Sequence, residues 1–277
     1  MNKLYFIGDT HGKWKDFENT IIVRGIRDAY IWHVGDGIFG LTNRRSDKEI
    51  LNMLNNFLLS RNIILYNTRG NHDNPYWFKS EDALIKQFEK EDKSIKSWNK
   101  EDYYYKHYYL NPIDFTNYIK NLSNIKFVKD YEIVNLNGLN ILSIGGAISV
   151  DRKIQLHDGS YFPIEKVSYN SKIHDIKNID IVVTHTVPLF AEPKTFAKIV
   201  YEYAVYDNNL IYELTQERKL LTKIHDELIK KNSNINYWFY GHYHHFIQNN
   251  YGDINFICLG ILELFEIDWL NRNVTRS

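Results

Sequence analysis

Residues 62–73, NIILYNTRGNHD, carry both the local fold signal and the chemistry of this chain. The apolar run at 63–66 is rich in the branched and aromatic residues that favour a buried strand. The run ends a few residues before Gly70, and Asn71, His72 and Asp73 follow in a row. All three side chains can bind metal ions. The stretch therefore predicts a strand that runs into a loop built to hold a ligand.

The residues before this stretch alternate between strand and helix patterns. Residues 3–8 and 29–34 read as buried strands, and residues 14–29 carry apolar side chains at roughly helical spacing. Ser46, with Glu49 three residues later, is a capping pair that predicts the start of a second helix. Strand, helix, strand, helix and strand in succession predict right-handed crossovers and a largely parallel sheet.

The residues after the stretch are less regular at first. Residues 74–129 are polar and aromatic, and we expect an insertion of helices and loops over or beside the site. Asn137 and Gly138, between two apolar runs, predict a β-hairpin. Patterns for a strand, a helix and three strands follow at residues 178–186, 214–232, 236–245, 245–250 and 254–260. We expect a single α/β domain over residues 1–277, with two sheets covered by helices.

Length, charge and cysteine content limit the class of protein. The chain has 277 residues, 44% of them hydrophobic, which is enough for a large core. Its 34 basic residues balance 34 acidic ones, so no global field attracts nucleic acid or an anionic membrane. Cys258 is the single cysteine and reads as a core residue of a strand. With no signal-peptide pattern and no bilayer-length apolar run, we expect a cytoplasmic protein without membrane partners.

Five of the predicted strands end in polar side chains of metal-binding type. Ligand sites of open α/β sheets lie beyond the carboxyl ends of the strands, so five such ends would build one shared site. Glycines flank the polar residues in four of the five segments and let the backbone come close to a bound group. The segments are GDTHG with Asp9 and His11, GDG with Asp36, GNHD with Asn71, His72 and Asp73, VVTHT with His185, and GHYH with His242 and His244.

The donor types in these segments indicate the kind of metal. Carboxylate and amide oxygens mixed with imidazole nitrogens suit Mn, Fe, Zn or Co, and the lack of thiolates argues against a structural zinc site. Seven good ligands exceed the need of one ion, which points to two ions that share a carboxylate. His242 and His244 are two residues apart, so in an extended chain they face the same way, and Asp9 and His11 repeat this spacing. The other six histidines are interpreted as structural.

The ordered set D-x-H, G-D, G-N-H-[D/E], H and G-H-x-H resembles the calcineurin-like metallophosphoesterase superfamily. The resemblance runs from Asp9 to His244 and implies a four-layer α/β/β/α sandwich of two mixed sheets flanked by helices. It also implies two divalent ions, Mn²⁺ first, with Fe, Zn, Co or Ni as alternatives. The implied ligands are Asp9, His11 and His244 for one ion, Asn71, His185 and His242 for the other, and Asp36 as the bridge.

The resemblance also implies catalytic roles. His72 matches the family's histidine that contacts the phosphate and acts as general acid, and Asp73 matches its orienting partner. In a two-metal site the ions lie roughly 3.5–4 Å apart, and a hydroxide that bridges them attacks phosphorus. Residues 35–40, GDGIFG, depart from the G-D-x-x-D-R-G of Ser/Thr protein phosphatases, and GNHD replaces their GNHE. Both departures argue against that subgroup.

The expected function is hydrolysis of a phosphomonoester or phosphodiester of a small molecule or nucleotide. Arg44, Arg69 and Arg152 lie in or near the predicted site loops and are candidate phosphate contacts. One alternative is a nuclease or nucleic-acid end-processing enzyme with the same centre, which the zero net charge disfavours. Another is a non-catalytic scaffold for partner proteins, although such members usually lose ligands and none is missing here.

Overall fold

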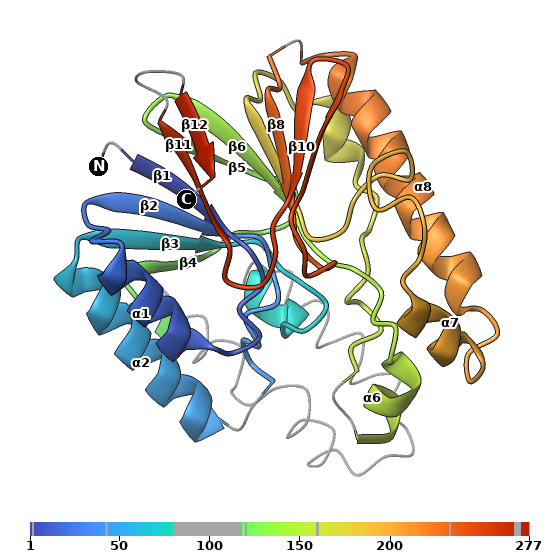
Figure 1. The fold of residues 1–277 in the computed structure, drawn as a ribbon, viewed down its shortest axis with the longest axis horizontal. Coiled ribbons are helices and arrows are strands. Elements are labelled where there is room, and N and C mark those ends of the chain that lie inside the picture. The colour runs from blue at the N-terminus through green and yellow to red at the C-terminus, as the bar shows by residue number, and fades with distance from the viewer. Residues whose placement is uncertain are drawn as a thin grey trace.

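The computed structural model describes residues 1, 3–41, 44–79, 118–119, 121–158, 161–232, 234–268 and 273–276. Most of the predicted insertion, residues 80–117 and 120, lies outside the described residues. Two six-stranded sheets form the centre of the molecule (Figure 1). Across the first sheet the order is β12 (Asn273–Arg276), β11 (Leu264–Asp268), β1 (Lys3–Ile7), β2 (Ala29–His33), β3 (Ile63–Asn67) and β4 (Ile125–Phe127). Across the second it is β5 (Glu132–Leu136), β6 (Leu139–Ile144), β7 (Ile181–Thr184), β8 (Tyr237–Tyr240), β10 (Ile254–Cys258) and β9 (Ile247–Tyr251).

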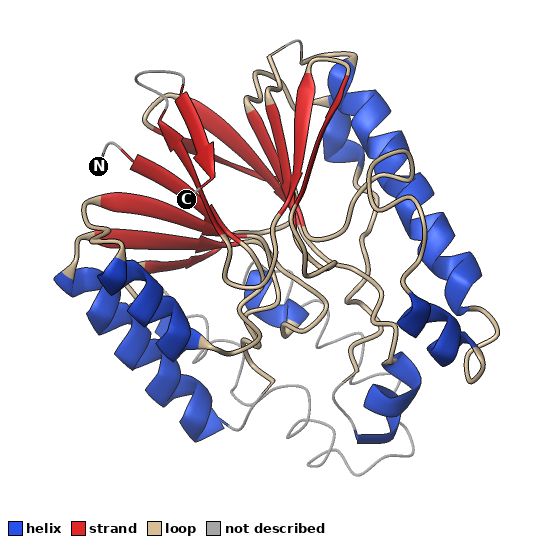
Figure 2. Cartoon of the chain, in the orientation of Figure 1, coloured by secondary structure: helices blue, strands red, loops and turns tan. Residues whose placement is uncertain are grey.

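Helices cover the outer faces of the two sheets (Figure 2). The described helices are α1 (Trp14–Val23), α2 (Arg44–Ser60), α6 (Arg152–Asp158), α7 (Lys198–Ala204) and α8 (Leu210–Ile229), with 3₁₀ turns η1 (Pro75–Phe78) and η2 (Ser171–His174). Within the described residues, no helix is both long enough and apolar enough to cross a lipid bilayer.

The pairing of the strands is mixed. The strands β1 to β4 are parallel, as are β6, β7, β8 and β10, whereas β11, β12, β5 and β9 pair antiparallel at the edges. The predicted parallel pairing of the first three strands is confirmed. So is the hairpin, in which Asn137 and Gly138 both have positive φ (51° and 93°), the pattern of a type I′ turn.

Three buried clusters hold the four layers together. Alternate residues of β1 divide between two of them: Leu4 and Phe6 pack between the sheets, whereas Tyr5 and Ile7 pack under α1 and α2. The Phe6 ring stacks on Phe239 of the second sheet with 3.8 Å between ring centroids. The third cluster packs α8 on the outer face of the second sheet. The expected α/β/β/α sandwich is confirmed.

Several element boundaries differ from the predictions. The first helix ends at Val23 rather than near residue 29, because Gly25 adopts φ +64° and closes a Schellman motif with Ile26 bonded back to Ile21. The second helix begins at Arg44, two residues before the predicted Ser46 cap. The strands β4, β11 and β12 and the helices α6 and α7 were not predicted. Cys258 is buried in the core, as expected.

Candidate metal centre

The carboxyl ends of β1, β2, β3, β7 and β8 meet where the two sheets come together, and their loops carry the predicted ligands (Figure 1). Two groups of donor side chains form there, and within each group the donor atoms lie within 4.8 Å of one another. The first group is Asp9, His11, Asp36 and His244, and the second is Asp36, His185 and His242. Asp36 belongs to both, which is the arrangement expected of a bridging carboxylate.

Asn71 joins the second group through its amide oxygen. Its Oδ1 lies 3.1 Å from Nε2 of His185, and the same Nε2 lies 3.2 Å from Oδ1 of Asp36. The other ring nitrogen of His185, Nδ1, lies 2.9 Å from the carbonyl oxygen of Val34. A carbonyl only accepts, so Nδ1 carries a proton, and Nε2 is the nitrogen that faces the site and can bind a metal ion once it is deprotonated.

The first group is equally convergent. The Nε2 atoms of His11 and His244 are 2.8 Å apart, and His244 Nε2 is 3.3 Å from Oδ2 of Asp9. Asp9 is fully buried and accepts hydrogen bonds from the backbone N–H of His242. Because that N–H belongs to the loop after β8, the contact ties the two halves of the centre together.

The backbone is strained at several of the candidate ligands. His11, Asp36, His242 and His244 all have φ between 45° and 69°, in the left-handed region that residues with a side chain rarely adopt. Each such residue costs about 1–3 kcal/mol. The chain is therefore not extended through His242 and His244, so the same-face argument, which assumed an extended chain, does not apply here. The two histidines fall into different donor groups, as the resemblance implied.

Glycines beside the ligands make room for neighbouring carboxylates. A Cβ at Gly241 would overlap Oδ1 of Asp9, and one at Gly70 would overlap Oδ1 of Asp36. Gly35, at φ +117°, faces the ring of His185 in the same way. These glycines were expected to let the backbone approach a bound group, and in the structure they let a ligand from another strand approach the backbone.

The residues of the second group shift the pKa values of one another. Burial by itself raises the pKa of Asp36, but His185 and His72 outweigh it and hold that pKa well below 3.8. Burial lowers the pKa of His185, and the Asp36 charge outweighs this and raises it to about 9. Burial first, and then the charge of His185, keeps the pKa of His242 well below 6.5. Without a cation, the Asp36–His185 pair therefore holds a proton that metal binding would release.

This donor set fits two divalent ions. Imidazole nitrogens, carboxylates and one amide oxygen converge, no thiolate is present in either group, and one carboxylate is common to both. Asp9, Asp36, Asn71 and His185 are buried, whereas His244 lies at the exposed edge. Mn, Fe, Zn and Co accept such donors.

His72 and Asp73 lie beside the centre in different surroundings. The backbone N–H of His72 donates to Oδ1 of Asp36 over 2.8 Å, and the half-buried side chain faces the cavity described below. The Asp73 carboxylate is fully buried and accepts three backbone N–H bonds, from Asp36, Phe39 and Gly70. Among the hydrogen bonds of the described residues, none joins Asp73 to the His72 ring, which is the contact that was expected.

The candidate phosphate-binding arginines have other partners. The Arg152 guanidinium contacts Asp207 and Glu213, at 2.6 Å each. That of Arg69 donates to Asp130 and to the carbonyls of Gly145 and Glu165. Neither is among the described residues that line the cavity, and the side chain of Arg44 lies outside the description. Their role in substrate binding stays a prediction.

Ser149 and Glu165, two residues that position Asn71, were not predicted from the sequence. Nδ2 of Asn71 donates to Oγ of Ser149 at 3.1 Å, and Ser149 donates from Oγ and from its backbone N–H to the carboxylate of Glu165. The available signal was the glycine-rich strand end GGAIS, residues 145–149, which identifies a tight loop but not its contact with Asn71.

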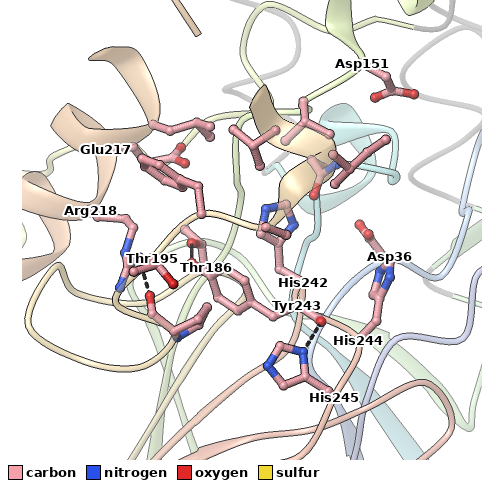
Figure 3. Close-up of a pocket in the computed structure, with 18 of the residues that line it drawn as sticks. Asp36, Asp151, Thr186, Thr195, Glu217, Arg218, His242, Tyr243, His244 and His245 are labelled. Carbon is pink, nitrogen blue, oxygen red and sulfur yellow. Dashed lines mark hydrogen bonds between the residues drawn. The ribbon is translucent and has the colours of Figure 1, made fainter. Parts of the chain in front are cut away.

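A cavity of about 540 Å³ opens from the centre toward α7 and α8 (Figure 3). Asp36, Asn71, His72, His242 and His244 lie on its wall. In Figure 3, Glu217 and Arg218 lie on the side of helix α8, opposite Asp36 and His244. The site is therefore open to a molecule larger than the ions themselves.

Comparison with known proteins identifies the family to which this pattern corresponds. The model of the calcineurin-like phosphoesterase family matches residues 3–246. No curated protein matches the chain. Similar solved structures include an archaeal phosphodiesterase (12% identity, TM-score 0.40, 99% of this chain and 97% of that one). Another is a phosphopantetheinyl hydrolase from Mycobacterium tuberculosis, with 13% identity, a TM-score of 0.44, and coverage of 99% of this chain and 93% of that one. A third is a dimetal phosphatase from Danio rerio, with 10% identity, a TM-score of 0.44, and coverage of 95% of this chain and 91% of that one.

Proposed function

Because the chain belongs to the calcineurin-like phosphoesterase family, we propose that it is a metal-dependent hydrolase of a phosphomonoester or phosphodiester, nucleotides included. The observation that carries this proposal is the position of Asp36, whose carboxylate belongs to both donor groups. A shared carboxylate can hold two ions close enough to clamp the oxygens of an in-line displacement, whereas a scaffold that only binds proteins has no use for that arrangement.

Two divalent ions would be held by this chain. Asp9, His11 and His244 would bind one, Asn71, His185 and His242 the other, and Asp36 both, with Mn²⁺ the first candidate and Fe, Zn, Co or Ni also suited. When bound, the ions activate water for attack on phosphorus and neutralise the phosphoryl oxygens.

His72 is the proton donor in this proposal. Its side chain reaches the cavity, while its backbone N–H is bonded to Asp36, so the ring is held at the edge of the centre without being one of the ligands. A histidine there can protonate the oxygen of the departing alcohol.

Asp73 is a positioning residue in this proposal. Its three N–H contacts pin the loop after β2, which carries Asp36, against the turn at Gly70. The Asp73 carboxylate therefore holds the backbone on both sides of Asp36. It would position His72 by fixing the backbone of these loops, without a hydrogen bond to the imidazole ring of His72.

Metal analysis and hydrolysis together test the proposal. Protein loaded with Mn²⁺ is expected to contain two ions per chain and to hydrolyse p-nitrophenyl phosphate or bis-p-nitrophenyl phosphate. The Asp36→Asn variant is expected to bind one ion in place of two and to be inactive. The Asp253→Asn variant, changed at an exposed turn, is expected to keep both ions and the activity. Two bound ions without hydrolysis of any phosphoester would favour the scaffold, and selective cleavage of oligonucleotides would favour the nuclease.

A further inference from the structure

The cavity beside the metal centre is too large for a phosphoryl group alone. Its volume of about 540 Å³ falls within the roughly 300–1,000 Å³ of pockets that enclose a whole small molecule. The ligand side chains occupy one end of it, and the other end extends to α7, α8 and the residues before α7. The far end is therefore the place where the remainder of a substrate would lie.

The far end of the cavity is apolar. Its wall is formed by Val150, Phe196, Ala197, Ile199, Val200 and Leu214. Val200 of α7 and Leu214 of α8 are buried, and they pack with Ile148 and Leu210 in a small core of their own. Because this core holds the wall in place, the apolar surface exists before any ligand binds.

The charged groups near this wall do not suit a second phosphate. Arg218 already donates to the carbonyl oxygens of Val187, Pro188, Ala191 and Pro193. No lysine occurs among the described residues that line the cavity. Of the two acids other than Asp36 among the described lining residues, Asp151 lies on the side of Asp36 and Glu217 lies opposite it on α8 (Figure 3). Glu217 is buried and accepts the backbone N–H groups of Ile148 and Val167, so neither acid offers a positive partner to a phosphate.

We propose that this wall is a leaving-group pocket that selects phosphoesters of uncharged, apolar alcohols, aromatic or aliphatic, over esters that carry a further phosphate. This inference rests on the proposed function, since it names the substrate class of the same site. Apolar surface buried against the wall stabilises binding roughly in proportion to its area, so longer apolar alcohols bind better until the cavity is filled.

A homologous series of substrates tests the inference. The 4-methylphenyl and 4-butylphenyl phosphates have leaving groups of nearly equal acidity, so their chemical steps match and only the apolar volume differs. We expect kcat/KM to be about tenfold higher for the butyl compound. Equal values for the two esters, or faster turnover of adenosine 3′,5′-bisphosphate than of the butyl ester, would overturn the inference while leaving the hydrolase activity intact.

A matched pair of variants locates the effect. Ala197→Phe places a phenyl ring in the cavity and is expected to reduce the butyl-to-methyl ratio about tenfold. Lys198→Phe adds the same ring one residue later, at an exposed side chain outside the cavity lining, and is expected to keep the wild-type ratio. Equal ratios in the two variants would show that the apolar wall does not select the substrate.

Binding without turnover separates this inference from the proposed function. Calorimetric titration of metal-free protein with 4-butylphenol is expected to show binding that is about tenfold weaker in Ala197→Phe and in Val200→Asn. The second variant makes the wall polar without filling it, and circular dichroism confirms that each is folded. If 4-butylphenol binds but no phosphoester is hydrolysed, the proposed function fails. If the esters are hydrolysed but the phenol does not bind, the pocket assignment fails alone.

Discussion

The side-chain amide of Asn71 is held by Ser149, whose Oγ accepts a hydrogen bond from Nδ2 over 3.1 Å. The contact turns Oδ1 of Asn71 toward His185 and the second donor group. Ser149 is anchored in turn by Glu165, which accepts from both its N–H and its Oγ. A chain of three buried residues thus sets the orientation of one predicted ligand.

Ser149→Ala is therefore expected to lower the affinity of the protein for one of the two ions. Contacts of this kind to metal ligands typically contribute about 10- to 100-fold in affinity. Isothermal titration with Mn²⁺ should show one site weakened by this factor and the other unchanged. Ser143→Ala is the matched control, since it removes a buried serine hydroxyl bonded to Thr68 at 2.9 Å, and neither residue belongs to a donor group. Wild-type affinity at both sites in Ser149→Ala would contradict the orienting role.

Each of the two histidines of the GHYH segment should be needed for the binding of a different ion. His244 lies in the group with Asp9 and His11, and His242 in the group with His185. Each single change to Ala is expected to lower the metal content from two ions to one, and the double change to abolish binding. Metal analysis by mass spectrometry checks the stoichiometry. Loss of both ions from either single variant would mean that the two groups are not independent.

Gly241→Ala should disrupt the metal centre although it replaces none of the candidate ligands. The added methyl carbon would overlap Oδ1 of Asp9, which is fully buried, so one of the two groups must shift. We expect the loss of the ion held by Asp9, measured as metal content. Gly252→Ala serves as control: its Cβ would meet open space, but φ is +60°, so stability falls by about 1 kcal/mol while metal content stays the same. Equal metal content in both variants would argue against the steric explanation.

His72→Ala should slow hydrolysis most for poor leaving groups. A general acid typically contributes about 10²- to 10⁴-fold. We expect such a loss with phenyl or alkyl phosphates and a smaller one with p-nitrophenyl phosphate, whose leaving group needs little protonation. Both ions should remain bound, and His174→Ala, at an exposed position, should behave as wild type. A uniform loss across leaving groups would assign His72 to phosphate binding instead.

Glu165 should make stability fall as pH rises. Burial raises its pKa from 4.5 to about 8, so the folded state holds the proton more tightly than the unfolded state. The stabilisation from this proton is complete below pH 4.5 and is lost as the pH rises toward 8. In Glu165→Gln, the amide oxygen can still accept the Ser149 N–H and the side chain no longer titrates, so the melting temperature should fall less between pH 5 and pH 9. Parallel pH profiles for the two proteins would contradict the assignment.

The order of strands and helices in residues 3–67, the hairpin at Asn137 and the set of donor residues could all be predicted from the amino-acid sequence. These depend on local apolar periodicity, turn chemistry and residue type, all of which act over short stretches of chain. The family could also be predicted from the sequence, because the motifs occur in a fixed order from Asp9 to His244.

The contacts among these residues could not be predicted, because they depend on how the layers pack. His11 and His244 are 233 positions apart and come within 2.8 Å because two sheets bring their strand ends together. The partners of Asp73, the ion pairs of Arg152 and the contact from Ser149 to Asn71 are likewise long-range. The apolar cavity wall depends on where α7 and α8 pack. Such contacts follow from the packing of layers, which no short stretch of sequence encodes.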